Sequence, residues 1–207
     1  MGLTTEQLTE AMDALAAREP AFAVALERIG YPPPRISERG FGTLLRTIIG
    51  QQVSVTSAQA TYRKLEGIVG SLDDPANIIA ATDEQLRAAG LSRQKASYAR
   101  SLSTLVTSGE LDLANLPEDD EEAIAKLVAV KGIGRWSAEI YLLFAEGRTD
   151  IWPAGDLAVQ IEIGRLLGHE ARPSEKLVRE LAEAWRPHRG AAAIFAWYHY
   201  QSDMKVI

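Results

Sequence analysis

The stretch that most constrains the fold is residues 127–160, which contain two helix boundaries of different kinds. An apolar repeat at helical spacing over residues 121–130 ends at the sequence KGIG, residues 131–134, and a second helical repeat starts at once. After that second helix, the segment IWPAG at residues 151–155 leads to Asp156, which stands at the head of a third apolar repeat. The chain therefore predicts two helices joined by a glycine hairpin, followed by a helix that begins at a carboxylate.

The glycine pair predicts a tight connection with chemistry of its own. Gly132 and Gly134 allow positive φ and close approach of another backbone, and Ile133 between them is suited to pin the two helices together. A helix N-terminus presents backbone N–H groups and partial positive charge, and such a terminus binds phosphate. Lys131 and Arg135 add formal charge on either side. The hairpin is therefore predicted to bind the phosphates of a nucleic-acid backbone. The alternative is an ordinary helical turn with glycine as its C-cap.

Asp156 allows two interpretations that are compatible with each other. Aspartate is a preferred N-cap residue, so the residue can simply begin the helix. A helix start can also present a carboxylate toward a cleft, where it takes part in chemistry. The position of Asp156, one helix beyond a phosphate-binding hairpin, favours a catalytic role.

Four segments together resemble the helix-hairpin-helix DNA glycosylases, and within them the bacterial DNA-3-methyladenine glycosylase II group and its relatives that excise alkylated bases. The segments follow the family order and are GQQVSVTSAQA at 50–60, VKGIGRWSA at 130–138, DIWPAGDLAVQ at 150–160 and WRPHRGAAAIFAW at 185–197. The resemblance implies an all-α, two-lobed fold with the active site in the cleft between the lobes. The matching segments lie between about Phe41 and Tyr200, and we expect residues 1–207 to form one compact glycosylase unit, with the hairpin at 121–146.

The resemblance also implies a base-excision chemistry. Asp156 would stabilise the oxocarbenium-like sugar as the base departs and would orient or activate the attacking water. Trp136 and His188, and more weakly Tyr141 and Trp152, would form aromatic walls for a flipped base, which is often cationic when alkylated. For each of these four side chains, packing in the core is the alternative.

The contacts with DNA follow from the same resemblance. In the family, a loop residue fills the gap left by the flipped base, and the matching residue here is Gln52. Because glutamine is polar, a loop glutamine that is only exposed to solvent is the alternative. The expected DNA-binding residues are Gln52, Lys131, Gly132, Ile133, Gly134 and Arg135. Such hairpins can also hold a monovalent sodium or potassium ion, here through the backbone carbonyls of Val128, Val130 and Ile133.

One position predicts the type of reaction. In the members of the superfamily with lyase activity, a lysine stands two residues after the second hairpin glycine, and this chain has Trp136 there. We therefore expect a monofunctional hydrolase that leaves an abasic site without cutting the strand. No catalytic metal is expected, because the three histidines have no ligand-like spacing.

Composition limits the partners. A net charge of −6 over 207 residues argues against a protein that coats nucleic acid nonspecifically, but it leaves room for a local basic face. The absence of cysteine excludes disulfides, a thiol nucleophile and the iron–sulfur cluster of the endonuclease III-like branch. With no signal peptide or membrane-spanning run visible, we expect a cytoplasmic, nucleoid-associated bacterial monomer that acts on double-stranded DNA containing alkylated bases.

The rest of the sequence predicts about ten helices and no strand. Residues 86–96 weakly echo the hairpin, and the acidic run at 118–122 is expected to project away from it. Three rival functions remain: a non-catalytic helix-hairpin-helix DNA-binding module, a glycosylase for another damaged base, and a helical enzyme unrelated to DNA. The preferred lesion is not determined by the sequence.

Overall fold

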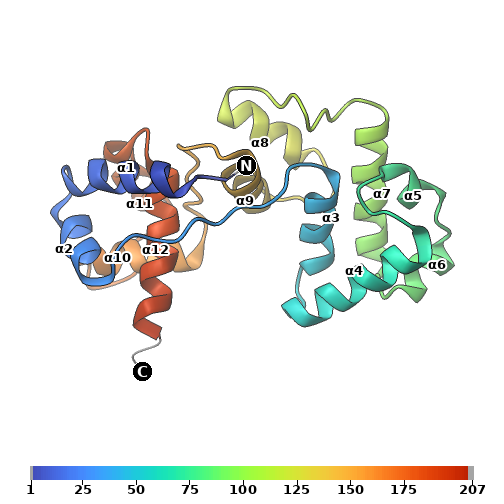
Figure 1. Cartoon of the computed structure of the whole chain (residues 1–207), viewed down its shortest axis with the longest axis horizontal. Helices are drawn as coiled ribbons and strands as arrows, with labels where there is room; N and C mark the ends of the chain where they lie inside the picture. Colours follow the sequence, from blue (N-terminus) through green and yellow to red (C-terminus); the bar gives the residue numbers. More distant parts are fainter. Residues whose placement is uncertain (1, 205–207) are drawn as a thin grey trace. The chain divides into compact units, whose positions relative to one another are not determined.

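The computed structural model describes residues 2–204, with the side chains of residues 2–202, and over this range it is helical without a strand, as the sequence predicts. The chain divides into two compact units (Figure 1). Unit 1 consists of Met1–Ser37 and Leu142–Ile207, and unit 2 is Glu38–Tyr141. No helix among the described residues has the length and apolar character needed to cross a membrane.

Unit 1 combines the two ends of the chain. Its helices are α1 (Thr5–Ala16), α2 (Pro20–Ile29), a π-helix (Leu142–Glu146), α10 (Leu157–Leu166), α11 (Glu175–Ala182), a 3-10 turn (Glu183–Trp185) and α12 (Arg189–Met204). Aromatic rings fill its core: Phe22 meets Trp185 edge-on at 5.1 Å between ring centroids and Phe195 at 5.9 Å. α12 packs against α10, α1 and α2, so the last helix joins the N-terminal helices to the segment that follows Asp156.

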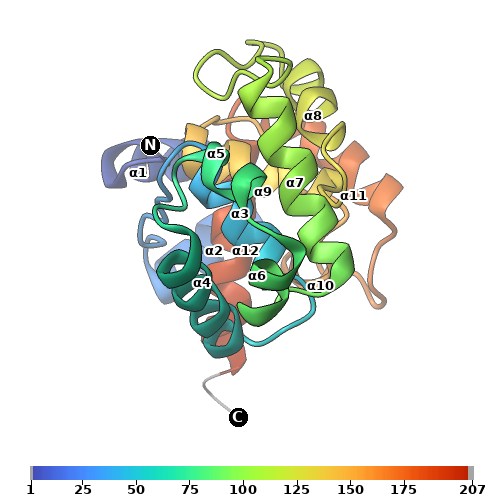
Figure 2. The same ribbon diagram turned by 90° about the vertical axis from the view of Figure 1, so that its right-hand side faces the viewer.

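Unit 2 is built around α7 (Arg93–Thr107), which packs against α3, α5 and α6; Figure 2 shows this side of the molecule. The other helices of the unit are α3 (Phe41–Gly50), α4 (Val55–Val69), α5 (Pro75–Ala80), α6 (Asp83–Ala88), α8 (Asp120–Val128) and α9 (Arg135–Tyr141). α8 and α9 pack against each other, as expected for the two helices of a hairpin.

Several helices begin at a residue whose side chain accepts a hydrogen bond from the first turn of the helix. Thr4 forms a capping box with Gln7, and Thr82 forms a capping box with Gln85, as their three-residue spacing predicts. The sequence did not predict α5, which has only six residues and begins with Pro75 after an aspartate cap. The described residues contain twelve α-helices rather than about ten.

Candidate nucleic-acid interface and carboxylate site

The hairpin between α8 and α9 needs glycine at its first turn. Gly132 has a φ of 86°, in the left-handed region that side chains with a Cβ rarely adopt. A Cβ at this position would lie 2.1 Å from the Tyr98 ring of α7, so the ring packs directly on the hairpin backbone. The N–H of Lys131 donates to the Ser101 hydroxyl of the same helix at 3.2 Å. The turn therefore rests on α7 as well as on its own two helices.

The hairpin presents backbone donors, as the sequence predicts. The buried Ile133 donates its N–H to the Val130 carbonyl at 3.0 Å, which closes the turn. The N–H groups of Gly132 and Gly134 donate to no acceptor within residues 2–204. Two backbone donors thus stand at the start of α9, where the helix dipole favours an anion.

Arg135 forms ion pairs within the hairpin, and its expected contact with DNA stays a prediction. Its guanidinium donates to Glu121 of α8 at 2.8 Å and to the buried Glu139 of α9 at 2.9 Å. The hydrogen bond that Arg135 donates to the Glu121 carboxylate is the main cause of a raised pKa for Arg135. The charge is therefore compensated by two carboxylates, and Arg135 ties the two hairpin helices together. The acidic run does not point wholly away from the hairpin either, because Glu121 makes this contact.

The loop that carries Gln52 is fixed to the hairpin. The side chain of Gln52 is exposed, and its φ of 55° is a left-handed conformation that is uncommon outside glycine. Its neighbour Gln51 donates from Nε2 to the Gly132 carbonyl at 2.6 Å. Lys95 of α7 donates from Nζ to the Ile49 carbonyl at 2.7 Å, and burial lowers the pKa of this lysine. The loop that carries the exposed Gln52 is therefore held in place by these hydrogen bonds.

The three carbonyls expected to hold a monovalent cation are not equivalent. The oxygen of Val130 accepts the Ile133 N–H, whereas those of Val128 and Ile133 accept no hydrogen bond from the described residues. Two open carbonyls fit an oxygen-ligated cation, so this site stays a prediction. The described residues contain no group of three or more His, Cys, Asp or Glu side chains arranged for a metal.

In unit 1, Asp156 begins α10 as an N-cap, and its carboxylate is also held from a second direction. Oδ1 accepts the backbone N–H of Val159 at 3.0 Å and the indole N–H of Trp197 on α12 at 3.1 Å. The carboxylate is half-buried. An N-cap needs only the first of these donors, so the indole contact is additional to helix capping and fixes how the carboxylate is aimed.

Trp197 is the functional candidate that sequence reasoning missed. Its ring is half-exposed and lies 5.6 Å from the Phe144 ring, over which the Arg35 guanidinium sits at 4.9 Å. The aromatic character of the last helix was visible in the sequence, but nothing there pairs this tryptophan with Asp156. The structure brings both into unit 1 beside an aromatic surface.

Two ion pairs hold the segment before Asp156. Asp150 accepts from Arg186 at 2.5 Å and from Arg189 at 2.9 Å, which joins the loop to the start of α12. The buried Gln160 side chain donates to the Ala154 carbonyl at 2.8 Å. These bonds position both ends of the segment that presents the carboxylate.

The four predicted aromatic walls have different environments. Trp136, in unit 2, is 47% exposed, and His188, in unit 1, is half-buried. Tyr141 is buried and accepts the Gly40 N–H at 2.9 Å, while Trp152 is buried, packs edge-on against Trp185 and donates to the Val178 carbonyl. Tyr141 and Trp152 are therefore packed against neighbouring residues, and Trp136 and His188 are the more exposed of the four; their role as walls for a base stays a prediction.

Replacing Gly132 by alanine is expected to destabilise the protein by about 1–3 kcal/mol, because of the positive φ and the overlap with Tyr98. Gly67 is the matched control, since it lies inside α4 with nothing within 4 Å of an added Cβ. Gly67→Ala should stabilise by about 0.5–1 kcal/mol. Urea denaturation measures both, and equal effects of the two substitutions would contradict this account of the hairpin.

The sequence is similar to a known family and to known proteins. The sequence profile described as "HhH-GPD superfamily base excision DNA repair protein" matches residues 45–187. DNA-3-methyladenine glycosylase 1 of Schizosaccharomyces pombe is 31% identical over 173 residues, which cover 81% of this chain and 76% of that protein. The chain spans 58% of the length of another curated relative, from Bacillus subtilis.

Solved structures show the same similarity. A DNA-3-methyladenine glycosidase from Bacillus halodurans matches with a TM-score of 0.87 and 30% identity over 96% of this chain and 91% of that one. The 3-methyladenine DNA glycosylase of S. pombe, in complex with abasic DNA, matches with a TM-score of 0.78 and 27% identity over 94% and 97%. The chain therefore belongs to the HhH-GPD superfamily of base excision DNA repair proteins.

Proposed function

We propose that this protein is a DNA glycosylase that hydrolyses the N-glycosidic bond of alkylated purines in double-stranded DNA and leaves an abasic site. The observation that carries the proposal is the Asp156 carboxylate, held at 3.0 Å by a helix N–H and at 3.1 Å by the Trp197 indole. The names of the similar proteins, which are 3-methyladenine glycosylases, support the choice of alkylated purines.

In this proposal the hairpin and the Gln52 loop hold the duplex open. The donors of Gly132 and Gly134 would take backbone phosphate, with Lys131 adding charge beside them. Gln52 would occupy the space of the flipped base. Its left-handed backbone and the bond from Gln51 to the hairpin support this role, because they fix the loop before DNA arrives.

The bond-breaking step would use Asp156 as the charged group nearest the sugar. The C1′–N bond breaks as the base leaves with its electron pair, and positive charge develops on C1′ and the ring oxygen. A fixed carboxylate stabilises that charge, and no reorganisation is needed when the charge appears. Water then adds to C1′ and its proton passes to the carboxylate. The indole of Trp197 would keep the carboxylate aimed throughout.

An alkylated purine often carries positive charge, and it should favour an electron-rich aromatic surface. Trp197 and Trp136 offer accessible indole rings, and His188 offers an accessible imidazole. We propose these three, rather than Tyr141 and Trp152, as surfaces for the extracted base. A tryptophan at position 136, where lyase members of the superfamily have lysine, supports hydrolysis by water over attack by an amine.

Substrate choice tests the proposal. Two duplexes are incubated with the protein, one treated with a methylating agent and one containing 8-oxoguanine, and the free bases are separated by chromatography. Release of 3-methyladenine or 7-methylguanine with no release of 8-oxoguanine is the expected result. Release of the oxidised base alone would assign the protein to the rival class of glycosylases, and binding without any release would indicate a DNA-binding module.

A further inference from the structure

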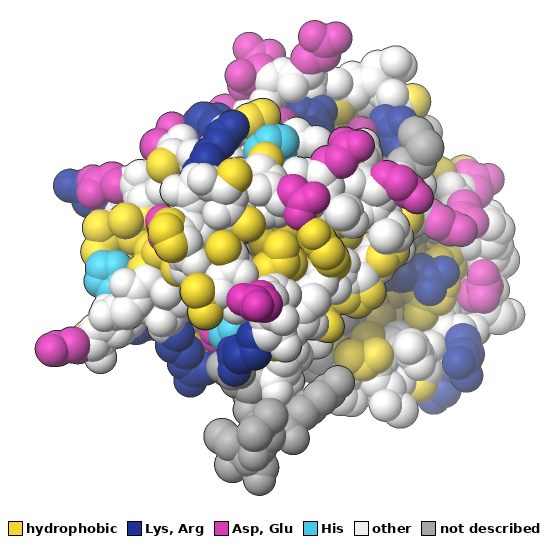
Figure 3. Space-filling view, turned by 60° about the vertical axis from the view of Figure 1, so that its left-hand side comes forward, with side chains coloured by type: hydrophobic (Ala, Val, Ile, Leu, Met, Phe, Trp, Pro, Cys, Tyr) yellow, Lys and Arg dark blue, Asp and Glu magenta, His cyan; other side chains and the backbone are white. Residues whose placement is uncertain are grey.

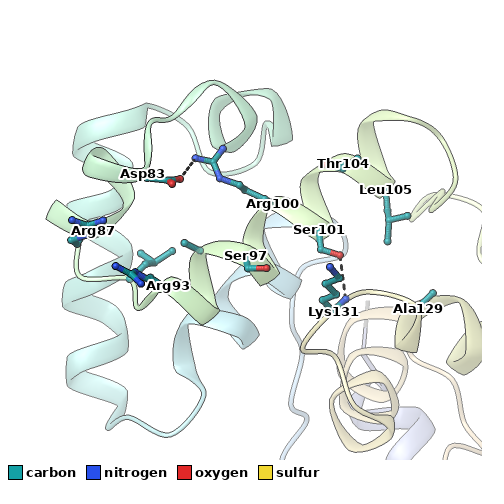
Figure 4. A pocket seen from close by; sticks show the side chains of 12 residues that line it. Asp83, Arg87, Arg93, Ser97, Arg100, Ser101, Thr104, Leu105, Ala129 and Lys131 are labelled. Atoms are coloured by element: carbon teal, nitrogen blue, oxygen red, sulfur yellow. Dashed lines mark hydrogen bonds and ion pairs between the residues drawn. The ribbon is translucent and has the colours of Figure 1, made fainter.

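A groove in unit 2 runs along one face of α7, and of the residues used above only Lys131 and Ser101 line it. Its volume is about 710 Å³, and both polar and apolar side chains line it (Figure 4). The apolar side chains that line it are Leu91, Ala96, Leu105 and Ala129. A groove lined by both apolar and polar side chains can accept the sugar and the phosphate of a nucleic-acid strand together.

One edge of the groove is a polar stripe along α7. Arg93, Ser97, Ser101 and Thr104 follow each other at intervals of three or four residues, so they share one face of the helix. Figure 4 shows Ser97 and Ser101 between Arg93 at one end and Lys131 at the other. At a rise of 1.5 Å per residue, the stripe is about 16 Å long. A DNA strand presents a phosphate at every nucleotide, so a stripe of this length can contact more than one of them.

The charges around the groove are unbalanced. Arg100 donates to Asp83 at 2.8 Å and to the Ala81 carbonyl at 2.8 Å, so its charge is used within the fold. Arg87, Arg93 and Lys131 are exposed, and none of them forms an ion pair with a carboxylate in residues 2–204.

Three uncompensated cations around one groove contrast with the rest of this acidic chain. The formal net charge of the whole chain is −6. On the face shown in Figure 3, acidic and basic side chains are interspersed. The charge in the groove therefore favours an anionic ligand that the protein's overall charge would repel.

The groove is continuous with the hairpin. Lys131 is the first residue of the KGIG turn, it lines the groove, and its N–H is bound to Ser101 in the polar stripe. A strand whose phosphate lies at the hairpin donors therefore has a basic, hydroxyl-lined path leading away from it along α7.

We propose that this groove is a second backbone-binding track, which holds phosphates of duplex DNA flanking those at the hairpin. The inference rests on the proposed function for the identity of the ligand as DNA. The track contacts no base, so it contributes affinity and salt dependence that do not depend on sequence or on damage. Its length, and hydroxyls about 6 Å apart along the helix, fit a repeating polyanion better than a single small anion.

The test is duplex binding by the double variant Arg87→Gln/Arg93→Gln, measured by fluorescence anisotropy with an undamaged 30-base-pair duplex over a range of salt concentrations. We expect binding roughly three- to tenfold weaker at 0.1 M salt, and a slope of log Kd against log salt reduced by about one to two. The matched control is Arg63→Gln/Lys64→Gln, which removes the same charge from exposed positions on α4 outside the groove. The control should bind within twofold of the native chain with an unchanged slope.

Unchanged binding by the groove variant, or an equal loss in both variants, would overturn the proposal. The rate of base release from methylated duplex at saturating protein should be the same for the groove variant and the native chain, because the groove does not touch the reacting sugar. If the native chain releases no base, the proposed enzymatic function fails. The difference in duplex affinity between groove variant and control still decides the groove in that case.

Discussion

Replacing Asp156 by asparagine is expected to lower the rate of base release from methylated duplex DNA by about a hundredfold or more. That factor corresponds to about 2.7 kcal/mol of transition-state stabilisation. Asparagine is also a good N-cap, and its oxygen can still accept the N–H of Val159 and the indole of Trp197, so the fold should persist. What the variant lacks is the negative charge, which is the property that the proposed chemistry requires.

The matched control is Asp119→Asn, the same substitution at the N-cap of α8, where Oδ1 accepts the Glu122 N–H at 2.9 Å. Single-turnover release of methylated purine should be unchanged in this control. If Asp156→Asn released base at the native rate, Asp156 would be a helix cap only, and the family assignment would stand without it.

The second large effect concerns a buried group of ionisable side chains behind the carboxylate site. Glu162 of α10 is completely buried and lies 2.5 Å from Nδ1 of His199 on α12. The Arg28 guanidinium contacts Nε2 of the same ring. Because arginine can only donate, Nε2 of His199 is the acceptor. Nδ1 therefore carries the ring proton and donates a hydrogen bond to Glu162. The pair joins the two helices that carry Asp156 and Trp197.

Removing the ring in His199→Ala should destabilise the protein by about 3–5 kcal/mol, because it leaves a buried carboxylate without its nearest partner. Urea denaturation followed by circular dichroism measures the change. Lys176→Ala is the control, since it breaks an exposed Lys176–Glu180 pair of the same unit and should give no measurable loss. A loss no larger in His199→Ala than in this control would contradict the proposed structural role of the pair.

Structural features that depend only on residues close together in the chain could be predicted from the sequence. The helix break at Gly132 depends on the residue's own backbone freedom, and the capping boxes at Thr4 and Thr82 span three residues each. The position of Asp156 at a helix start was likewise a local property. Each of these is decided within one turn of helix, so the residues themselves contain the information.

Features that depend on distant partners could not be predicted. Trp197 stands 41 residues from Asp156, and a helical repeat identifies the face of a helix without identifying what that face meets. The same limit applies to Arg135, whose partner Glu121 is 14 residues away in another helix. The positive charge of Arg135 indicated phosphate binding, whereas the fold places the Glu121 carboxylate beside that charge. The burial of Trp152 and Tyr141 is similarly a result of packing between helices.

The measurement that tests the central claim most directly compares base release with strand breakage in the same sample. The native chain is incubated with a methylated duplex labelled at one end. Free purine is quantified, and the strands are separated with and without hot alkali. The account predicts free methylated purine and intact strands that break only after alkali, which reveals abasic sites. Strand breaks without alkali, or no free purine while the duplex remains bound, would contradict it.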